Sequence, residues 1–107
     1  MNPEELFAHM STVFAKCIET AKLKNADYSG SNISAFKNFR LVEEAGLTST
    51  EIGIGVRLTD KLSRMCTLLK GAKPNVVDEK LEDTIEDAIN YLAILHAYLT
   101  FKNKILK

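Results

Sequence analysis

Apolar residues recur at three- and four-residue intervals along three long stretches of the chain, and this periodicity constrains the fold most strongly. The stretches carry Leu6, Met10, Val13, Cys17 and Ala21, then Leu58, Leu62, Met65 and Leu69, then Leu81, Ile85, Ala88, Leu92, Leu95 and Leu99. Such spacing places an apolar stripe along one face of a helix. The sequence therefore predicts an all-α single domain over 1–107, a small bundle of three long helices and one short helix.

Capping and turn residues set the boundaries expected in the first half of the chain. Asn2 and Glu5 begin a first helix over 3–24. The stretch 25–32 is rich in Asn, Ser, Asp and Gly and is expected to be a surface loop. Ser34 can then cap a short helix that ends at Gly46.

Similar signals mark the second half. Thr48-Ser49-Thr50-Glu51 is a capping-box pattern, and the third helix is expected to run from it to about Lys70. Its early glycines, Gly53 and Gly55, could permit the close approach of a backbone or a ligand.

The last helix is expected over 78–105, capped by Asn75 or Asp78. At 1.5 Å per residue it would be about 40 Å long. That is longer than a small bundle needs, so its end is expected to pack on another subunit of a homo-oligomer.

The chain is electrically balanced, with 14 basic and 14 acidic residues and a formal net charge of zero. General nucleic-acid binders are clearly basic, so general nucleic-acid binding is disfavoured. No leader-like segment or long apolar run stands out, which predicts no membrane association and a cytoplasmic location, in the host cell if a phage encodes the chain.

Cysteines and histidines show no metal-binding or catalytic spacing. Cys17 and Cys66 lie among apolar residues at helical spacing and are expected to be buried free thiols. His9 and His96 stand on separate helices without an evident carboxylate partner, and each is expected at the edge of the core.

A basic row marks the third helix. Arg57, Asp60, Lys61 and Arg64 share one face, beside the apolar stripe. Two arginines and a lysine could grip a phosphate or carboxylate there, because a guanidinium offers bidentate geometry. The alternative is a solvated face with internal pairing, for example between Asp60 and Arg64.

An acidic row marks the last helix. Glu79, Asp83, Asp87 and Asn90 recur at intervals of four, four and three residues, which places them on one stripe. Clustered carboxylates suit Mg²⁺, which prefers hard oxygen ligands. The alternative is a solvated acidic first turn that the helix dipole favours.

The expected loop supplies a third candidate. Tyr28 could stack on a base, and Asn38 could read a base edge through hydrogen bonds. The alternative is an ordinary capped turn. Walker and dinucleotide-binding glycine loops do not occur in the sequence.

Several of these residues form an ordered pattern. It consists of Asp27-Tyr28, Phe36-x-Asn38-Phe39, Ile52-Gly53-x-x-x-Arg57-x-x-Asp60-Lys61-x-x-Arg64, Asp78-Glu79 and Asp83-Thr84-x-x-Asp87-x-x-x-Tyr91. In this order the chain resembles the phage and prophage family called nucleotide modification associated domain 1, over about 25–95. The resemblance implies a role around phage nucleotide metabolism.

The helical layout is more distantly similar to the all-α nucleoside triphosphate pyrophosphohydrolases of the MazG and dimeric dUTPase kind. That resemblance implies acidic pairs on two helices that hold Mg²⁺ against a triphosphate. Asp83 and Asp87 match part of the second pair, but Arg57-x-x-Asp60-Lys61 stands where the first is expected. Bases in place of acids remove metal ligands and add phosphate donors.

Three hypotheses follow. In the first, the protein binds a nucleotide or nucleotide-derived ligand without a cofactor, to carry it or to sequester a signal used in host defence. In the second, it is a Mg²⁺-dependent pyrophosphohydrolase, whose metal ligands come from Asp60, Glu79, Asp83 and Asp87. In the third, it is a structural helical adaptor, in which Arg57 and Arg64 pair with Asp83 and Asp87.

Overall fold

The computed structural model describes residues 1–29, 35–73 and 80–105. Its helices are α1 (Pro3–Ser29), α2 (Lys37–Glu44), α3 (Thr50–Leu69) and α4 (Leu81–Ile105). These ranges contain no strand, and none of their helices is long and apolar enough to cross a membrane. The all-α prediction of three long helices and one short helix is confirmed, and α4 is the expected long C-terminal helix.

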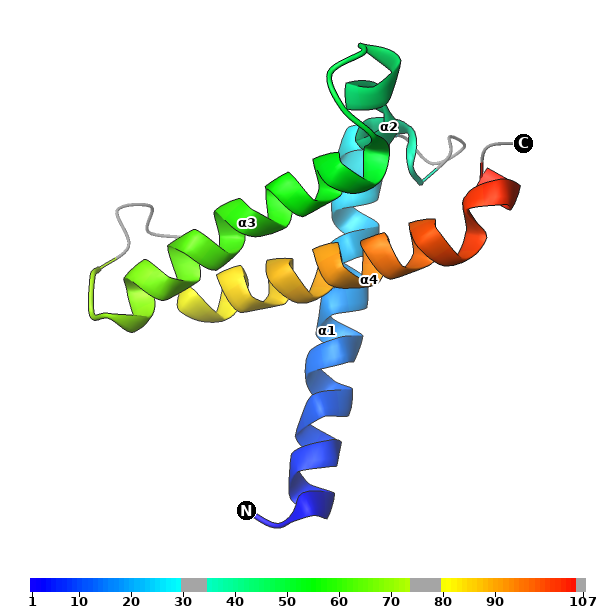
Figure 1. Cartoon of the computed structure of the whole chain (residues 1–107). Helices are drawn as coiled ribbons and strands as arrows, with labels where there is room; N and C mark the ends of the chain where they lie inside the picture. The colour runs from blue at the N-terminus through cyan, green and yellow to red at the C-terminus, as the bar shows by residue number, and fades with distance from the viewer. Residues whose placement is uncertain (30–34, 74–79, 106–107) are drawn as a thin grey trace.

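The helices form a cross rather than a parallel stack. α3 and α4 lie side by side and run in opposite directions, and α1 crosses them at a steep angle (Figure 1). α2 lies beside the C-terminal end of α1 and the start of α3, while the N-terminal half of α1 projects away (Figure 1). The molecule accordingly measures 45 × 33 × 22 Å along its principal axes.

Side-chain caps hold the starts of two helices. The Glu5 amide donates to Asn2 Oδ1 at 2.9 Å, as the sequence predicts. At the start of α3 the Ile52 amide donates to Ser49 Oγ at 3.2 Å, so the capping residue is Ser49. Gly46 and Gly71, with φ of 77° and 103°, follow the ends of α2 and α3 in a conformation that favours glycine.

The first helix extends further than expected. Residues 25–29 continue α1 to Ser29, so the loop predicted from 25 onward is wrong over this stretch. Asn25 is half-buried against the other helices, and packing of that kind overrides a local preference for turns. The prediction for Ser34, and the position of the Tyr28 side chain, lie outside the part of the chain that is described.

The described α4 begins at Leu81, three residues later than the start predicted at residue 78. The Lys80 amide donates to Asp83 Oδ2 at 3.1 Å, so a carboxylate of the first turn satisfies a backbone donor. Asn75 and Asp78, the predicted caps, lie outside the described residues.

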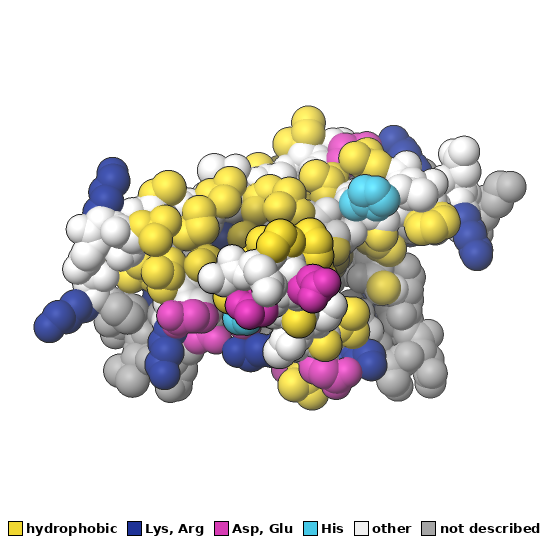
Figure 2. Space-filling view, turned by 90° about the horizontal axis from the view of Figure 1, so that it is seen from below, with side chains coloured by type: hydrophobic (Ala, Val, Ile, Leu, Met, Phe, Trp, Pro, Cys, Tyr) yellow, Lys and Arg dark blue, Asp and Glu magenta, His cyan; other side chains and the backbone are white. Residues whose placement is uncertain are grey.

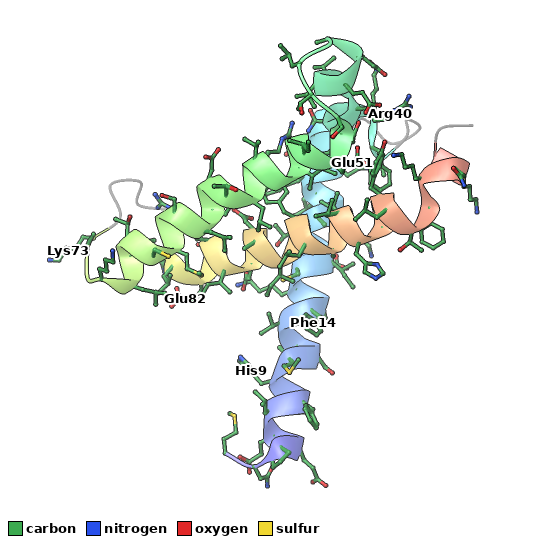
Figure 3. The ribbon with its side chains drawn as sticks, viewed as in Figure 1. His9, Phe14, Arg40, Glu51, Lys73 and Glu82 are labelled. Atoms are coloured by element: carbon green, nitrogen blue, oxygen red, sulfur yellow. The ribbon has the colours of Figure 1, made fainter. Side chains whose placement is uncertain are left out.

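The core is small and lies where α3 and α4 meet each other and α1. Its buried apolar side chains are Cys17, Ile54, Ala88 and Tyr98. Cys17 is buried as expected, but Cys66 is exposed because it faces away from these contacts. His9 and His96 are also exposed rather than at the core edge; Figure 3 shows His9 on the projecting part of α1.

Gly53 allows α2 to pack closely on α3. A Cβ at Gly53 would lie 2.6 Å from Val42 Cγ2, whereas a Cβ at Gly55 would meet no atom within 4 Å. The close approach expected at these glycines is therefore found at Gly53 and comes from a neighbouring side chain.

Large apolar side chains remain open to solvent over much of the surface. Figure 2 shows a broad band of hydrophobic side chains across the width of the molecule, seen from the side of the projecting helix. The exposed large apolar side chains include Phe7, Phe14, Ile18, Leu92 and Leu99. Contiguous apolar surface of this kind marks interaction sites in soluble proteins.

Candidate functional site

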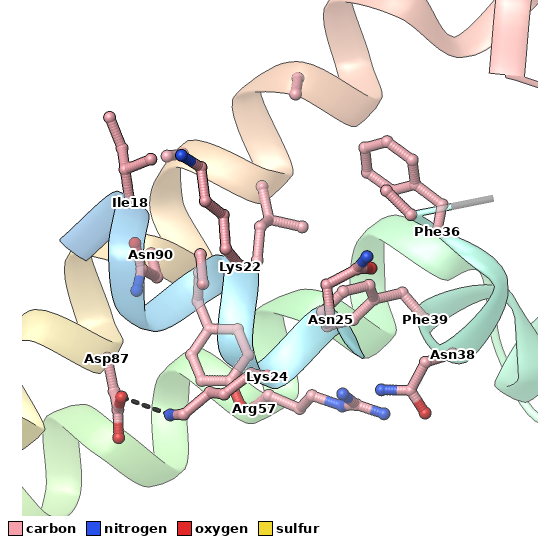
Figure 4. A pocket seen from close by; sticks show the side chains of 16 residues that line it. Ile18, Lys22, Lys24, Asn25, Phe36, Asn38, Phe39, Arg57, Asp87 and Asn90 are labelled. Carbon is pink, nitrogen blue, oxygen red and sulfur yellow. Dashed lines mark hydrogen bonds and ion pairs between the residues drawn. The ribbon is translucent and has the colours of Figure 1, made fainter. Parts of the chain in front are cut away.

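A cavity of about 530 Å³ lies where the four helices meet. The C-terminal half of α1 forms one wall, α2 and Arg57 of α3 form another, and the middle of α4 forms a third (Figure 4). Most of the lining surface is apolar, and a few polar side chains project into it. Small-molecule sites in proteins have this composition and this size.

Helical spacing places the polar residues of α1 and α4 on the cavity walls. Lys22 and Asn25 follow Ile18 and Ala21 on one face of α1 at steps of three and four residues. Asp87, Asn90, Tyr91, Ile94 and Ala97 repeat the same steps on α4. Two amphipathic helices that cross thus turn their mixed faces toward a shared space.

Arg57 is the most distinctive cation of the cavity. Its guanidinium carbon lies 4.7 Å from the centroid of the Phe39 ring, a cation–π contact that fixes the side chain. No carboxylate of the described residues pairs with it. Its guanidinium points toward Asn38, which projects from α2 (Figure 4). An arginine placed in this way can offer its planar donors to an anion.

Asp87 joins three helices at the edge of the cavity. Lys24 Nζ of α1 lies 2.6 Å from its Oδ1, and Lys61 Nζ of α3 lies 3.1 Å from its Oδ2. The Asp87 side chain is only 12% exposed, so both oxygens need such partners. The carboxylate therefore holds two lysines near the cavity and leaves the group of three with a net positive charge.

The crossing of α1 over α4 is fixed by polar contacts next to the cavity. The side-chain amide of Asn90 donates from Nδ2 to the backbone carbonyl of Cys17 at 3.0 Å, and Lys16 forms a 3.1 Å ion pair with Glu86. Burial raises the pKa of the Cys17 thiol, so it stays protonated at neutral pH and is a poor nucleophile. Asn90 and Cys17 therefore position the helices.

The other residues of the predicted basic and acidic rows lie elsewhere. Asp60 and Arg64 line a second hollow of about 360 Å³ near the C-terminal end of α3. Arg64 Nε donates to Thr84 Oγ1 at 3.2 Å, and Asp83 binds the Lys80 amide. The two rows thus face each other and touch, but only part of each reaches the larger cavity.

The described carboxylates are not gathered into a metal-binding cluster. The described residues contain no group of three or more His, Cys, Asp or Glu that could hold a metal ion, and Glu79 lies outside them. Lysine ammonium groups already occupy both oxygens of Asp87, and Asp83 is bound at the start of its own helix. A divalent cation at Asp87 would have to displace these cations.

The structure brings together Asn38, Arg57, Asp87 and Asn90 of the predicted ligand set, with Lys61 reached through Asp87. Sequence reasoning missed three residues of α1, which are Lys22, Lys24 and Asn25. Phe36 and Phe39, which flank Asn38 in the sequence pattern, also line the cavity. If the helix predicted over 3–24 is continued past residue 24, the steps of four and three residues place Ile18, Lys22 and Asn25 on a common face.

Comparison with known proteins adds no relative: the chain matches no family description, no curated protein and no solved structure.

Proposed function

We propose that this protein binds a nucleotide or a nucleotide-derived, phosphate-bearing ligand in the cavity between the four helices, as a phage-type carrier or sequestering protein. The observation that carries the proposal is Arg57, held over Phe39 without a carboxylate partner among the described residues. A guanidinium so oriented binds phosphate oxygens through two parallel hydrogen bonds.

The apolar part of the cavity suits a nucleobase. Phe39 and Tyr91 meet edge to face, with ring centroids 6.4 Å apart, and both rings belong to the wall. Any nucleobase can stack on aromatic faces of this kind, because every base has a π-face. The volume of about 530 Å³ also lies within the range of small-molecule sites, which is roughly 300–1,000 Å³.

Polar groups around these rings give the ligand an orientation. Asn25 of α1 and Asn38 of α2 both line the cavity, and their side-chain amides can donate to and accept from a base edge (Figure 4). Lys22, which pairs with Glu19, and Lys24, which pairs with Asp87, bring two further cations to the α1 side. Phosphate would therefore lie toward Arg57 and the lysines, and the base would lie against the aromatic wall.

A carrier or sequestering role needs no metal and no turnover, and we take the functional form to be the homo-oligomer that the sequence predicts. The described lining of the cavity holds cationic and amide donors, and the one carboxylate within that lining, Asp87, is engaged by two lysines. These features favour the binding of an intact phosphate group over Mg²⁺-dependent hydrolysis.

A second candidate is a structural helical adaptor, because the contact between Lys61 and Asp87 and the bond from Arg64 to Thr84 lock α3 to α4. The pairing differs from the predicted one: Asp87 pairs with lysines rather than with Arg57 or Arg64. In this role the cavity would be a by-product of helix crossing.

Calorimetric titration of the intact protein with a panel of mono- and dinucleotides, in a chelating buffer, tests the proposal. We expect saturable binding without product formation, and stabilisation of the chain by the ligand through mass action. Arg57→Gln should weaken binding about 10- to 100-fold, as expected for the loss of a charged hydrogen bond.

Arg64→Gln is the matched control, because it removes the same charge from the same helix at the second hollow and should leave affinity unchanged. Equal losses for both variants would indicate a nonspecific charge effect and contradict the proposed site. The absence of binding by every nucleotide in the panel would favour the adaptor.

A further inference from the structure

The N-terminal half of α1 has no packing partner within the described chain. Every side chain of residues 1–12 is exposed, and Cys17 is the only buried residue of the described part of α1. Figures 1 and 3 show this half as an isolated rod, and Figure 3 places His9 and Phe14 on it, clear of α3 and α4. Isolated helices of about 12–15 residues are marginal in water, so this segment needs a partner to persist.

The isolated segment carries a wide apolar stripe. Phe7, Phe14 and Ile18 are spaced by seven and four residues and therefore share one face of the helix. They are 61%, 45% and 56% exposed. Leu6 and Met10 lie beside them, in line with the buried Cys17, so the stripe continues the face that α1 already packs against α4.

The exposed surface is larger than a monomer of this mass normally shows. The accessible area is 7808 Å², whereas about 6,000 Å² is expected for a compact chain of 11.9 kDa. The radius of gyration is 15.5 Å against an expected value of about 13 Å. A standard interface needs only about 800 Å² from each partner, so the excess is sufficient for one.

The charges of α1 favour a second copy of the same helix in the opposite direction. Glu4 and Glu5 lie at its beginning, and Lys22, whose ion pair with Glu19 lies within α1, stands further along, whereas Lys16 is engaged by Glu86 of α4. In an antiparallel pair the acidic end of each helix meets the basic part of the other, twice by symmetry. A parallel pair would place the acidic ends together, and like charges would repel.

We infer that this chain forms a symmetric dimer through the N-terminal half of α1, in which the stripe of Phe7, Phe14 and Ile18 packs against its equivalent in antiparallel orientation. Ile18 also lines the cavity, so the second copy would border the ligand site. The dimer is expected whether or not the cavity binds a ligand.

Light scattering coupled to size exclusion tests the inference on the intact protein at micromolar concentrations. We expect about twice the 11.9 kDa of one chain, and a return to the mass of one chain in Phe7→Lys/Phe14→Lys. The matched control is Leu92→Lys/Leu99→Lys, which places the same charges on exposed apolar positions of α4 and should leave the mass doubled. A monomeric natural chain, a dimeric α1 variant, or loss of the dimer in the α4 variant would each overturn the inference.

Hydrogen exchange on the natural chain provides a test that requires no substitution. Amides of residues 3–16 should be protected at high concentration and should lose most of that protection on dilution, while those of α3 keep theirs. Protection of 3–16 that does not change with concentration would rule out the dimer, even if the α1 variant fails to fold.

Discussion

Lys24 and Asp87 are 63 positions apart in the sequence, yet their side chains form a 2.6 Å ion pair at the edge of the cavity. Lys61 binds the other oxygen of the same carboxylate. One partly buried acid thereby fixes the position of α1 relative to α3 and α4. The cavity depends on this relationship, because the same three helices form its walls.

Replacement of this acid should loosen the helix crossing. Asp87→Asn removes two ion pairs while it keeps the shape of the side chain, and we expect the free energy of unfolding to fall by about 1–3 kcal/mol, because both lysines are partly exposed. Urea denaturation measures the change. The control is Asp60→Asn, an exposed acid on α3, which should stay within about 0.5 kcal/mol of the natural chain. Equal effects of the two substitutions would count against a special role for Asp87.

The two glycines of α3 should respond oppositely to alanine. Gly55→Ala meets open space and should raise stability by up to about 1 kcal/mol through helix propensity. Gly53→Ala brings a Cβ within 2.6 Å of Val42 Cγ2, and this crowding should make it about 1–3 kcal/mol less stable than Gly55→Ala. Thermal unfolding compares them. Val42→Ala should reduce the penalty at Gly53, and additive effects of the two substitutions would contradict close packing of α2 on α3.

The link between the start of α3 and the end of α4 should depend on pH. The backbone amide of Glu51, together with the 3.1 Å contact from its carboxylate to Lys102, holds the pKa of the Glu51 carboxyl below its ordinary value of 4.5. Because this pKa is lower in the folded chain than in the unfolded chain, the ionised carboxylate stabilises the fold above pH 4.5. This stabilisation is lost as the pH falls through the lowered pKa. Glu51→Gln should therefore be less stable than the natural chain at pH 7, and the two should converge in acid. A difference that stays constant down to pH ~3 would be inconsistent with this linkage.

The thiols should differ in reactivity. Cys66 is exposed, whereas Cys17 is buried and burial raises its pKa. A thiol-specific reagent should modify Cys66 rapidly in the native protein and Cys17 only after unfolding. Mass spectrometry of the labelled peptides identifies the site. Rapid labelling of Cys17 under native conditions would mean that the contact between α1 and α4 opens readily.

The helical class was predictable because the signals for it are local. Apolar spacing gives three long helices, the pairing of Asn2 with Glu5 caps the first, and glycine at 46 and 71 follows the ends of two others. Each of these signals acts within a few residues of the element that it defines. Global packing does not alter them.

The site was only partly predictable because it depends on how helices cross. Spacing along α3 and α4 shows which residues share a face, but it does not show that α1 crosses them and brings Lys24 to Asp87. The turn-forming residues 25–29 continue α1 in the structure, where Asn25 is half-buried at the helix crossing, so the tertiary setting outweighs their local preference. Tertiary contacts of this kind leave no pattern in the segment itself.

The length of α1 connects two regions that would otherwise be independent. Residues 3–29 form one continuous helix, whose first part stands free and whose last part walls the cavity. Because the helix is continuous, a displacement of its free end should also shift its other end, where Lys24 and Asn25 line the cavity. Dimerisation through the free end and ligand binding in the cavity should consequently be coupled, so that each changes the affinity of the other by the same factor.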